Sequence, residues 1–249
     1  MEVFEHEKQK EVYQAKIEFF TNVAHEIRTP LTLIIGPMEK LIKQADAIPA
    51  IEKNLRIMGR NTDRLLKLTN QLLDFRKTET SEFSLNFVKA DISEILKDVF
   101  LQFQPAAEQQ DMKYNLHLPE KKLLAYIDVE AFYKMISNLV DNAIKYGKTT
   151  VQINLSLLEG DKFAVRVKND GHRIPIDIKD KIFEPFFRGK ETEIKAGTGI
   201  GLSISKSLAQ LHSGELYLDF NDRDFNIFVL ELPIHQLIEF NLNGKWKKL

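Results

Sequence analysis

The chain has 249 residues, of which 43% are hydrophobic, and 35 Lys and Arg stand against 36 Asp and Glu, with no cysteine. The formal net charge of −1 excludes the broad basic field of a general nucleic-acid binder, so no direct nucleic-acid binding is expected. The lack of cysteine excludes disulfides and thiolate chemistry. No apolar run approaches the roughly 18–20 residues that cross a bilayer. The sequence predicts a soluble segment, which could belong to a longer protein.

Residues 5–78 are highly charged, and their apolar residues recur three and four positions apart, as on one face of a helix. A helix–helix turn is predicted over 43–49. Two such helices bury their stripes poorly alone, so we expect a helical hairpin that pairs with a second copy into a dimeric four-helix bundle. A hairpin packed against the rest of its own chain is the alternative. The stripe residues are Ile17, Phe20, Ala24, Ile27, Leu31, Ile34, Met38 and Leu41, then Ile51, Leu55, Met58, Thr62, Leu65, Thr69 and Leu72.

After residue 82 the pattern changes to strands and helices that indicate a layered α/β domain. The predicted organisation is a helical hairpin over 1–82, an α/β sandwich over 83–235 and a tail over 236–249 without an assigned role. A loop-rich stretch is expected over 171–199. We expect strands over 83–88, 112–118, 123–127, 150–158, 163–167, 216–220 and 225–232, and helices over 92–104, 129–146 and 200–212.

His25 lies one position past the stripe residue Ala24, on the flank of the first predicted helix. Glu26 follows it directly, Thr29 lies one turn further on, and Pro30 loosens the helix nearby because it has no N–H to donate. An exposed imidazole beside a carboxylate is a candidate nucleophile with its base. An ordinary solvated histidine is the alternative for these residues alone.

The string Phe19-Phe-Thr-Asn-Val-Ala-His25-Glu-Ile-Arg-Thr-Pro30-Leu-Thr-Leu closely resembles the H-box of sensor histidine kinases. The resemblance implies that His25 accepts a phosphoryl group on a ring nitrogen. It implies that Glu26 takes the ring proton, and that Thr29 orients water when a phosphorylated receiver partner is dephosphorylated.

Asn138, Asn142 and Lys145 lie along one face of the helix predicted over 129–146. Amide oxygens beside an ammonium suit a hydrated Mg²⁺ and the phosphates that it bridges, although a solvated polar stripe would look the same. The segment resembles the N-box of the histidine-kinase ATPase domain. The resemblance implies that Asn142 ligates Mg²⁺, Asn138 supports the metal or phosphates, Lys145 contacts phosphate and Tyr146 lies by the nucleoside.

The glycine-rich segment Gly197-Thr198-Gly199-Ile-Gly201-Leu202 opens the helix predicted over 200–212. Glycines allow close backbone approach, and free N–H groups at a helix start hold anionic phosphate, although a flexible turn would use the same residues. The segment resembles the family's second glycine box, which implies that its residues bind nucleotide.

The segment Ile182-Phe-Glu-Pro-Phe-Phe187-Arg188 brings three aromatic residues into the loop-rich stretch. They are either core anchors or part of a binding element. The segment resembles the F-box, which implies an ATP lid with Phe187 and Arg188 by the nucleotide. Residues 188–195, with their many charges, are predicted to be its mobile portion.

The string Asn169-Asp-Gly171-His-Arg173-Ile-Pro175 departs from the family pattern Asp-x-Gly-x-Gly, whose Asp accepts a hydrogen bond from the adenine amino group. Asn169 stands at the Asp position, and its oxygen can accept that bond without a carboxylate's charge, so we expect weak ATP affinity. Arg173 stands at the second glycine and lacks glycine's freedom at positive φ. Asp170 is the alternative acceptor if the loop shifts by one residue.

The boxes follow the family's order over residues 16–233 and imply a histidine kinase core that uses ATP and Mg²⁺. The implied reaction transfers the γ-phosphoryl group to His25 and onward to an aspartate of a response-regulator receiver domain, which could belong to the same full-length chain. The implied setting is the cytoplasmic portion of an inner-membrane hybrid sensor kinase that forms homodimers.

Two rival interpretations remain. A hydrolysing ATPase of the same superfold would carry a water-activating Glu four residues before the metal-binding Asn, where this chain has Asn138. A non-catalytic dimeric signalling scaffold with impaired ATP binding would keep the hairpin and tolerate the altered glycine box.

Overall fold

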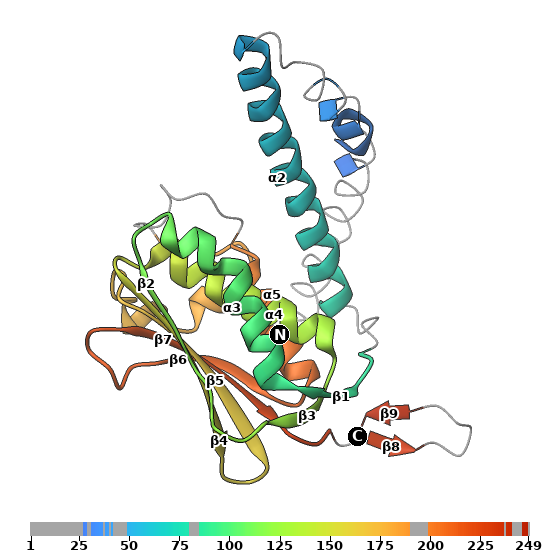
Figure 1. The fold of residues 1–249 in the computed structure, drawn as a ribbon. Helices are drawn as coiled ribbons and strands as arrows, with labels where there is room; N and C mark the ends of the chain where they lie inside the picture. Colours follow the sequence, from blue (N-terminus) through green and yellow to red (C-terminus); the bar gives the residue numbers. More distant parts are fainter. Residues whose placement is uncertain are drawn as a thin grey trace, which may run out of the picture. The chain divides into compact units, whose positions relative to one another are not determined.

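The computed structural model describes residues 27–28, 31–36, 38–39, 41, 49–79, 85–189, 199–236, 238–240 and 246–248. The chain divides into two compact units, Met1–Phe83 and Ser84–Leu249. The first is helical where it is described, and the second is an α/β sandwich (Figure 1). The expected combination of a helical hairpin and an α/β domain is therefore confirmed. The expected turn over 43–49 lies almost wholly outside the described residues.

The first unit contains the long helix α2, Pro49–Glu79, which lies against the helical residues described between 27 and 41. Proline suits the start of a helix because the first N–H groups have no partner there. Arg28 donates a hydrogen bond to the side chain of Asn70, and the methyl group of Met38 lies beside Gly59. As the residue number rises on one segment it falls on the other, so the two segments run antiparallel.

Along each apolar stripe of the hairpin, buried and exposed residues alternate. Both the buried positions and the exposed positions recur every seven residues. Leu31 and Met38 on one segment, and Thr62 and Thr69 on α2, are all less than 9% exposed. The alternate stripe positions are 40–53% exposed in the single chain: Ile27, Ile34, Leu41, Ile51, Met58 and Leu65. One hairpin therefore buries only part of the stripe that the sequence contains.

The second unit is built on a five-stranded sheet in the order β2-β4-β5-β7-β6. Only β2 and β4 are parallel neighbours, and the other pairs are antiparallel. Alternate residues on one face are buried, among them Ile153, Val165, Leu230 and Leu216, as a half-covered sheet requires. The strands are β2 (Lys113–His117), β4 (Thr150–Leu158), β5 (Lys162–Asn169), β6 (Glu215–Asp219) and β7 (Asn226–Pro233).

Three helices cover that face of the sheet: α3 (Ile92–Glu108), α4 (Val129–Tyr146) and α5 (Gly201–Leu211), as Figure 1 shows. Asp91 and Asp128 cap α3 and α4, and each accepts backbone N–H bonds of the first turn. The buried core side chains of α4 include Phe132, Met135, Ile136, Leu139 and Val140. Because the core takes this side of α4, its polar side chains lie on the opposite flank.

Smaller elements complete the described part of the unit. Strands β1 (Val88–Asp91) and β3 (Leu124–Ile127) form an antiparallel pair, and β8 (Ile238–Phe240) pairs with β9 (Trp246–Lys248) in the tail. Two short 3₁₀ turns, η2 (Ile176–Ile178) and η3 (Lys181–Phe183), lie in the stretch expected to be loop-rich. No helix in the described ranges has the length and apolarity needed to span a membrane.

Two predicted elements differ from the structure by more than two residues at an end, and the other predicted elements that are described agree within two residues. The strand expected over 83–88 is instead β1, because Ala90 and its neighbours pair with β3 while residues 85–87 are irregular. Residues 83 and 84 lie outside the described ranges. The helix expected to end at 104 continues through Pro105 to Glu108, so this proline does not end the helix. The helix expected over 129–146 and the strand expected over 150–158 have the predicted bounds.

Candidate functional site

The polar flank of α4 carries four of the predicted site residues, Asn138, Asn142, Lys145 and Tyr146, all half-buried. Buried residues such as Leu139 and Ala143 alternate with them along the helix and fix which flank remains accessible. The ammonium of Lys145 lies 4.8 Å from the centre of the Tyr146 ring. The helix therefore presents amides first and then a cation beside an aromatic ring.

The first of these amides joins α4 to the start of α5. Asn138 Nδ2 donates to the carbonyl oxygen of Gly201 at 3.3 Å and to the hydroxyl of Ser205 at 3.2 Å. A Cβ on Gly201 would lie 3.6 Å from Cγ of Asn138. The second glycine box is thus held against the N-terminal half of the polar flank of α4, where Leu202 is also half-buried.

The last turn of α4 meets the loop that follows β5. A Cβ on Gly171 would collide with the carbonyl group of Tyr146 and would lie 2.8 Å from Oδ1 of Asn169. Real Cβ atoms do not come so close to backbone, so this position requires glycine for space. The segment Asn169-Asp-Gly171, which we call the first glycine segment, is therefore held at the C-terminal end of the polar flank.

The two glycine segments therefore meet α4 at Asn138 and at Tyr146, with Asn142 between them. Eight residues of helix rise by about 12 Å, so the two segments contact well-separated points along one flank of α4. The start of α5 supplies N–H groups and the positive end of a helix dipole, which favour phosphate at that end. The other end contains Tyr146 and Asn169.

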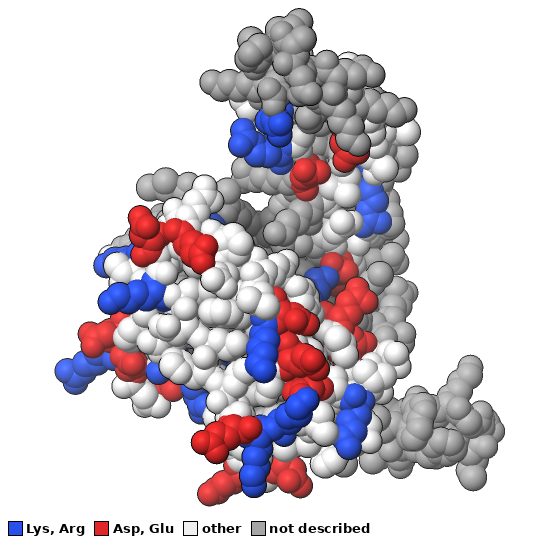
Figure 2. Space-filling model, in the orientation of Figure 1, with Lys and Arg blue, Asp and Glu red and all other residues white. Residues whose placement is uncertain are grey.

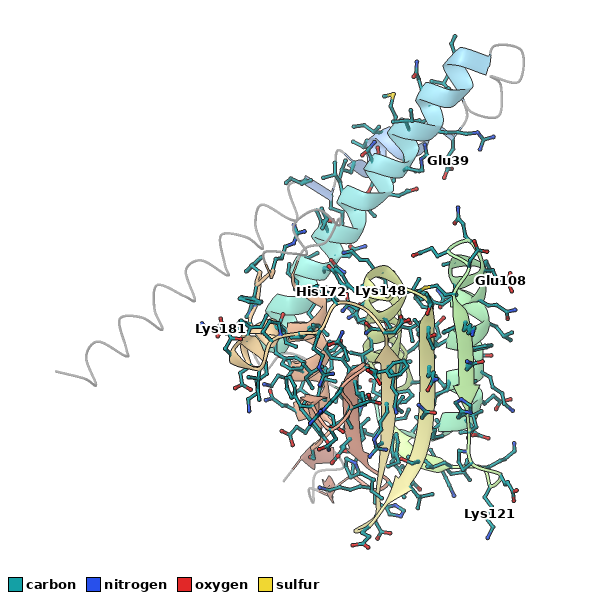
Figure 3. All side chains as sticks on the ribbon, turned by 90° about the vertical axis from the view of Figure 1, so that its left-hand side faces the viewer. Glu39, Glu108, Lys121, Lys148, His172 and Lys181 are labelled. Carbon is teal, nitrogen blue, oxygen red and sulfur yellow. The ribbon has the colours of Figure 1, made fainter. Side chains whose placement is uncertain are left out.

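Asp170, in the loop after β5, binds the backbone at the start of β4. Its carboxylate accepts the N–H groups of Lys148, Thr149 and Thr150 at 2.9–3.0 Å and the Thr149 hydroxyl at 2.5 Å. Burial alone would raise the pKa of Asp170, but the bonds from Thr149, Thr150 and Lys148 outweigh it and hold that pKa well below its ordinary range. Figure 3 labels Lys148 and His172 at the same end of the sheet, opposite Lys121. The hydrogen bonds of this carboxylate are therefore made within the protein.

Asn169 is only 3% exposed and lies at the end of β5, directly across from Asn226 on β7. Its Oδ1 accepts the N–H of Gly171 at 3.1 Å and an N–H of Asn226 at 3.5 Å. Asn226 in turn accepts the N–H of Ile174 and donates to the carbonyl oxygen of His172. The oxygen that we expected to face adenine thus already accepts two hydrogen bonds.

Arg173 points to the turn between β6 and β7. Its guanidinium donates to the carbonyl oxygens of Phe225 and Phe220 and lies 5.4 Å from the centre of the Phe220 ring. Arg173 is not among the residues with positive φ. The backbone conformation at this position therefore does not require glycine. The Arg173 side chain instead holds the loop by its hydrogen bonds.

The F-box meets the second glycine box at its ends. Phe186 has a φ of 65°, and its N–H donates to the carbonyl oxygen of Gly199 at 3.0 Å. Gly199 has a φ of 73°, and a Cβ there would lie 2.8 Å from the backbone of Phe186 and Phe187. Phe183 is buried against Phe228, whereas Phe187 and Arg188 are half-buried. A backbone hydrogen bond therefore joins the F-box to Gly199 of the second glycine box.

Several predicted site residues lie outside the described ranges: His25, Glu26, Thr29, Gly197 and Thr198. The predicted mobile stretch 188–195 is described only as far as residue 189. No cluster of three or more His, Cys, Asp or Glu suited to a metal occurs among the residues that the structure describes. A Mg²⁺ ion here would depend on an amide such as Asn142, on water and on phosphate oxygens, all of which supply the oxygen ligands that this hard cation prefers.

Charges of both signs are interspersed over the coloured atoms of the face drawn in Figure 2, without a block of one sign. This distribution agrees with the near-balanced charge count of the sequence. A phosphorylated ligand would therefore be bound by local N–H groups and single cations such as Lys145, because a broad surface field is lacking on that face.

Asn226 and Ser205 were not among the predicted site residues, and the hydrogen bonds by which Asp170 and Arg173 hold the loop after β5 were not predicted either. Asn226 is 57 residues from Asn169, and only the pairing of β5 with β7 brings them together. A usable signal was present, because Asn226 is followed by the apolar run Ile227–Leu230, and all five of these residues are buried. A buried amide in such a run requires hydrogen-bond partners.

Two family models match the chain. "His Kinase A (phospho-acceptor) domain" matches residues 15–81, and "Histidine kinase-, DNA gyrase B-, and HSP90-like ATPase" matches residues 127–236. Among curated relatives, Histidine kinase P4 of Formosa agariphila is 32% identical over 94% of this chain, and Hybrid signal transduction histidine kinase D of Dictyostelium discoideum is 32% identical over 96%. The chain spans only 18% and 16% of those two proteins.

Solved structures agree on the fold. Full-length ShkA in complex with AMPPNP superposes with a TM-score of 0.76 at 22% identity, covering 87% of this chain and 45% of ShkA. Histidine kinase ThkA in complex with the response regulator protein TrrA gives a TM-score of 0.62 at 26% identity, covering 94% of this chain and 67% of that one. The two family models and the curated relatives show that the chain belongs to the sensor histidine kinases and contains their catalytic core.

Proposed function

We propose that this chain uses Mg·ATP to phosphorylate His25 and then passes the phosphoryl group to an aspartate of a receiver domain. Residues 1–82 would be the dimerisation and phosphotransfer unit, and residues 83–235 the ATP-binding unit. The observation that supports this proposal best is the position of two glycine segments at the two ends of the polar flank of α4. That spacing suits one nucleoside triphosphate.

In this proposal each described residue has a separate task. Gly199 and the N-terminal turn of α5, with Gly201 and Leu202, would hold phosphate through backbone N–H groups, and Lys145 would add a cation. Asn142 would supply an oxygen to Mg²⁺, which when bound neutralises the charge of the phosphates. Asn138 would keep the phosphate loop in place through its bonds to Gly201 and Ser205. Tyr146 would lie beside the nucleoside.

The first unit would supply the acceptor. His25 would attack the γ-phosphorus with a ring nitrogen, Glu26 would receive the other ring proton, and ADP would leave. Thr29 would orient the water molecule that attacks the phosphoryl group of a phosphorylated receiver partner and releases phosphate. Orienting and neutralising the reactants supplies most of the catalysis in phosphoryl transfer. We also propose that the chain is the cytoplasmic portion of a longer membrane sensor. The response regulator that accompanies ThkA supports a receiver domain as the onward partner.

The half-exposed stripe supports a homodimer. Six apolar side chains at seven-residue intervals on the hairpin remain 40–53% exposed in one chain, and a second hairpin would bury them in a four-helix bundle. Ile34→Glu should convert the dimer to a monomer in light scattering. Leu33→Glu is the matched control because Leu33 is 70% exposed and lies outside the stripe. Equal effects of the two variants would argue against this interface.

The test of the transfer step incubates the chain with γ-labelled ATP and Mg²⁺. We expect label that is lost in acid and kept in base, as for a phosphoramidate, and that is absent in His25→Gln. His117→Gln is the matched control because His117 lies exposed on β2. Label that persists in His25→Gln would contradict the proposal. Nucleotide binding without transfer would favour the non-catalytic scaffold.

A further inference from the structure

The orientation of the Asn226 side chain is fixed by two backbone groups. Its Oδ1 accepts the N–H of Ile174 at 2.9 Å, and its Nδ2 donates to the carbonyl oxygen of His172 at 2.8 Å. Exchanging the oxygen and nitrogen would place donor against donor and acceptor against acceptor. The amide nitrogen of Asn226 must therefore be the atom that faces Asn169.

This orientation fixes that of Asn169 in turn. Two donors, the N–H of Gly171 and Nδ2 of Asn226, converge on one end of its amide, at 3.1 and 3.5 Å. That end must be the oxygen, and its two lone pairs are then in use. The remaining end is an NH₂ group, which only donates. A carboxylate at this position would leave an acceptor there.

The NH₂ group of Asn169 lies where it would affect which ligand binds. Asn169 is 3% exposed and is packed beside Gly171, which meets α4 at the carbonyl group of Tyr146. This is the nucleoside end of the proposed site, so the inference rests on the proposed function. A buried amide discriminates strongly between ligands, because a mismatched donor there cannot turn to water.

We propose that Asn169 makes the site favour a purine with a hydrogen-bond acceptor at position 6. Adenine has an amino group there, which would place donor against donor. Guanine and hypoxanthine have a carbonyl oxygen, which accepts from Asn169 Nδ2. The 6-oxopurine nucleotides GTP and ITP are thus ligands of this chain, and they bind at least as tightly as ATP.

ITP is the sharpest probe, because it differs from ATP at position 6 and lacks the extra 2-amino group of GTP. The experiment measures the affinity of the 249-residue chain for ATP, ITP and GTP by calorimetry in the presence of Mg²⁺. The same titrations are made on Asn169→Asp, which keeps an acceptor for Gly171 and Asn226 and so preserves the loop. Asn115→Asp, on the exposed side of β2, is the matched control.

We expect wild type and Asn115→Asp to bind ITP at least as tightly as ATP. We expect Asn169→Asp to shift the ratio of affinities toward ATP by about tenfold or more, as a mismatched base contact does. An ATP preference of tenfold or more in wild type that Asn169→Asp leaves unchanged would overturn the inference. Absence of binding by all three nucleotides in both proteins would also overturn it.

This test separates the two proposals. The affinity ratio is measured without any phosphoryl transfer, so it stands even if His25 is never labelled. An ATP preference in wild type that survives Asn169→Asp, combined with labelling of His25, would leave the kinase proposal intact and remove only the inference about the base.

Discussion

The guanidinium of Arg173 donates to the carbonyl oxygen of Phe225 and so ties the loop after β5 to the turn between β6 and β7. A second bond reaches the carbonyl oxygen of Phe220, whose ring the guanidinium also faces. The same loop is held by Asn226 through Ile174 and His172. Arg173 stands where the family pattern has its second glycine, and its side chain stabilises the loop at the nucleoside end of the proposed site.

Arg173→Gly should therefore destabilise the chain even though it restores the family pattern. Loss of the two bonds to backbone carbonyls should lower the free energy of unfolding by about 1–3 kcal/mol. Urea denaturation measures this change. Arg223→Gly is the control, because Arg223 is exposed on the same turn. A variant Arg173→Gly as stable as wild type would show that the bonds do not fasten the loop.

Asp170 should make the second unit sensitive to acid. Its pKa in the folded chain lies below the ordinary value of 3.8, so its contribution to stability is complete above that value and is lost as the pH falls toward the folded-state pKa. Asp170→Asn should cost about 1–2 kcal/mol at pH 7, because solvent screens this accessible carboxylate, and its deficit should shrink below about pH 4. Denaturation at several pH values checks both. A deficit independent of pH would contradict the assignment, and Asp224→Asn is the exposed control.

Gly171→Ala should weaken nucleotide binding. The added methyl group would collide with the carbonyl group of Tyr146 and with the Asn169 side chain, so the loop must move away from α4. Nucleotide affinity should fall by about tenfold or more, since an ångström-scale displacement is enough for such a loss. Gly36→Ala is the matched control because nothing lies within 4 Å of its added Cβ. Normal affinity of Gly171→Ala for every nucleotide would place the ligand elsewhere.

His212 should prove essential for the fold. It is fully buried, its Nδ1 lies 2.7 Å from the carbonyl oxygen of Leu208, and its Nε2 accepts the N–H of Asp128 at the start of α4. His212→Leu leaves both backbone groups without this partner and should cost about 2–4 kcal/mol in thermal or urea unfolding. His117→Leu, at an exposed position of β2, should cost far less. Similar costs for the two would contradict this role.

Local patterns predicted elements whose signals lie within a short stretch of sequence. Helix α4 has its cap Asp128, its apolar face and its end at Tyr146 within twenty residues, so its bounds follow from sequence alone. Strand β1 has no such pattern, because Lys89-Ala-Asp91 becomes a strand only by pairing with β3. The pairing of Asn226 with Asn169 depends on the register of β5 and β7, which no local pattern encodes.

The most direct measurement of the central claim is mass spectrometry of the chain after incubation with Mg²⁺ and a nucleoside triphosphate, with digestion kept at neutral to basic pH. The account predicts one added phosphoryl group in the peptide that contains His25, and none in that peptide when Asn142→Ala removes the proposed metal ligand. A phosphoryl group on any other residue, or an unmodified His25 peptide from a chain that binds nucleotide, would contradict it.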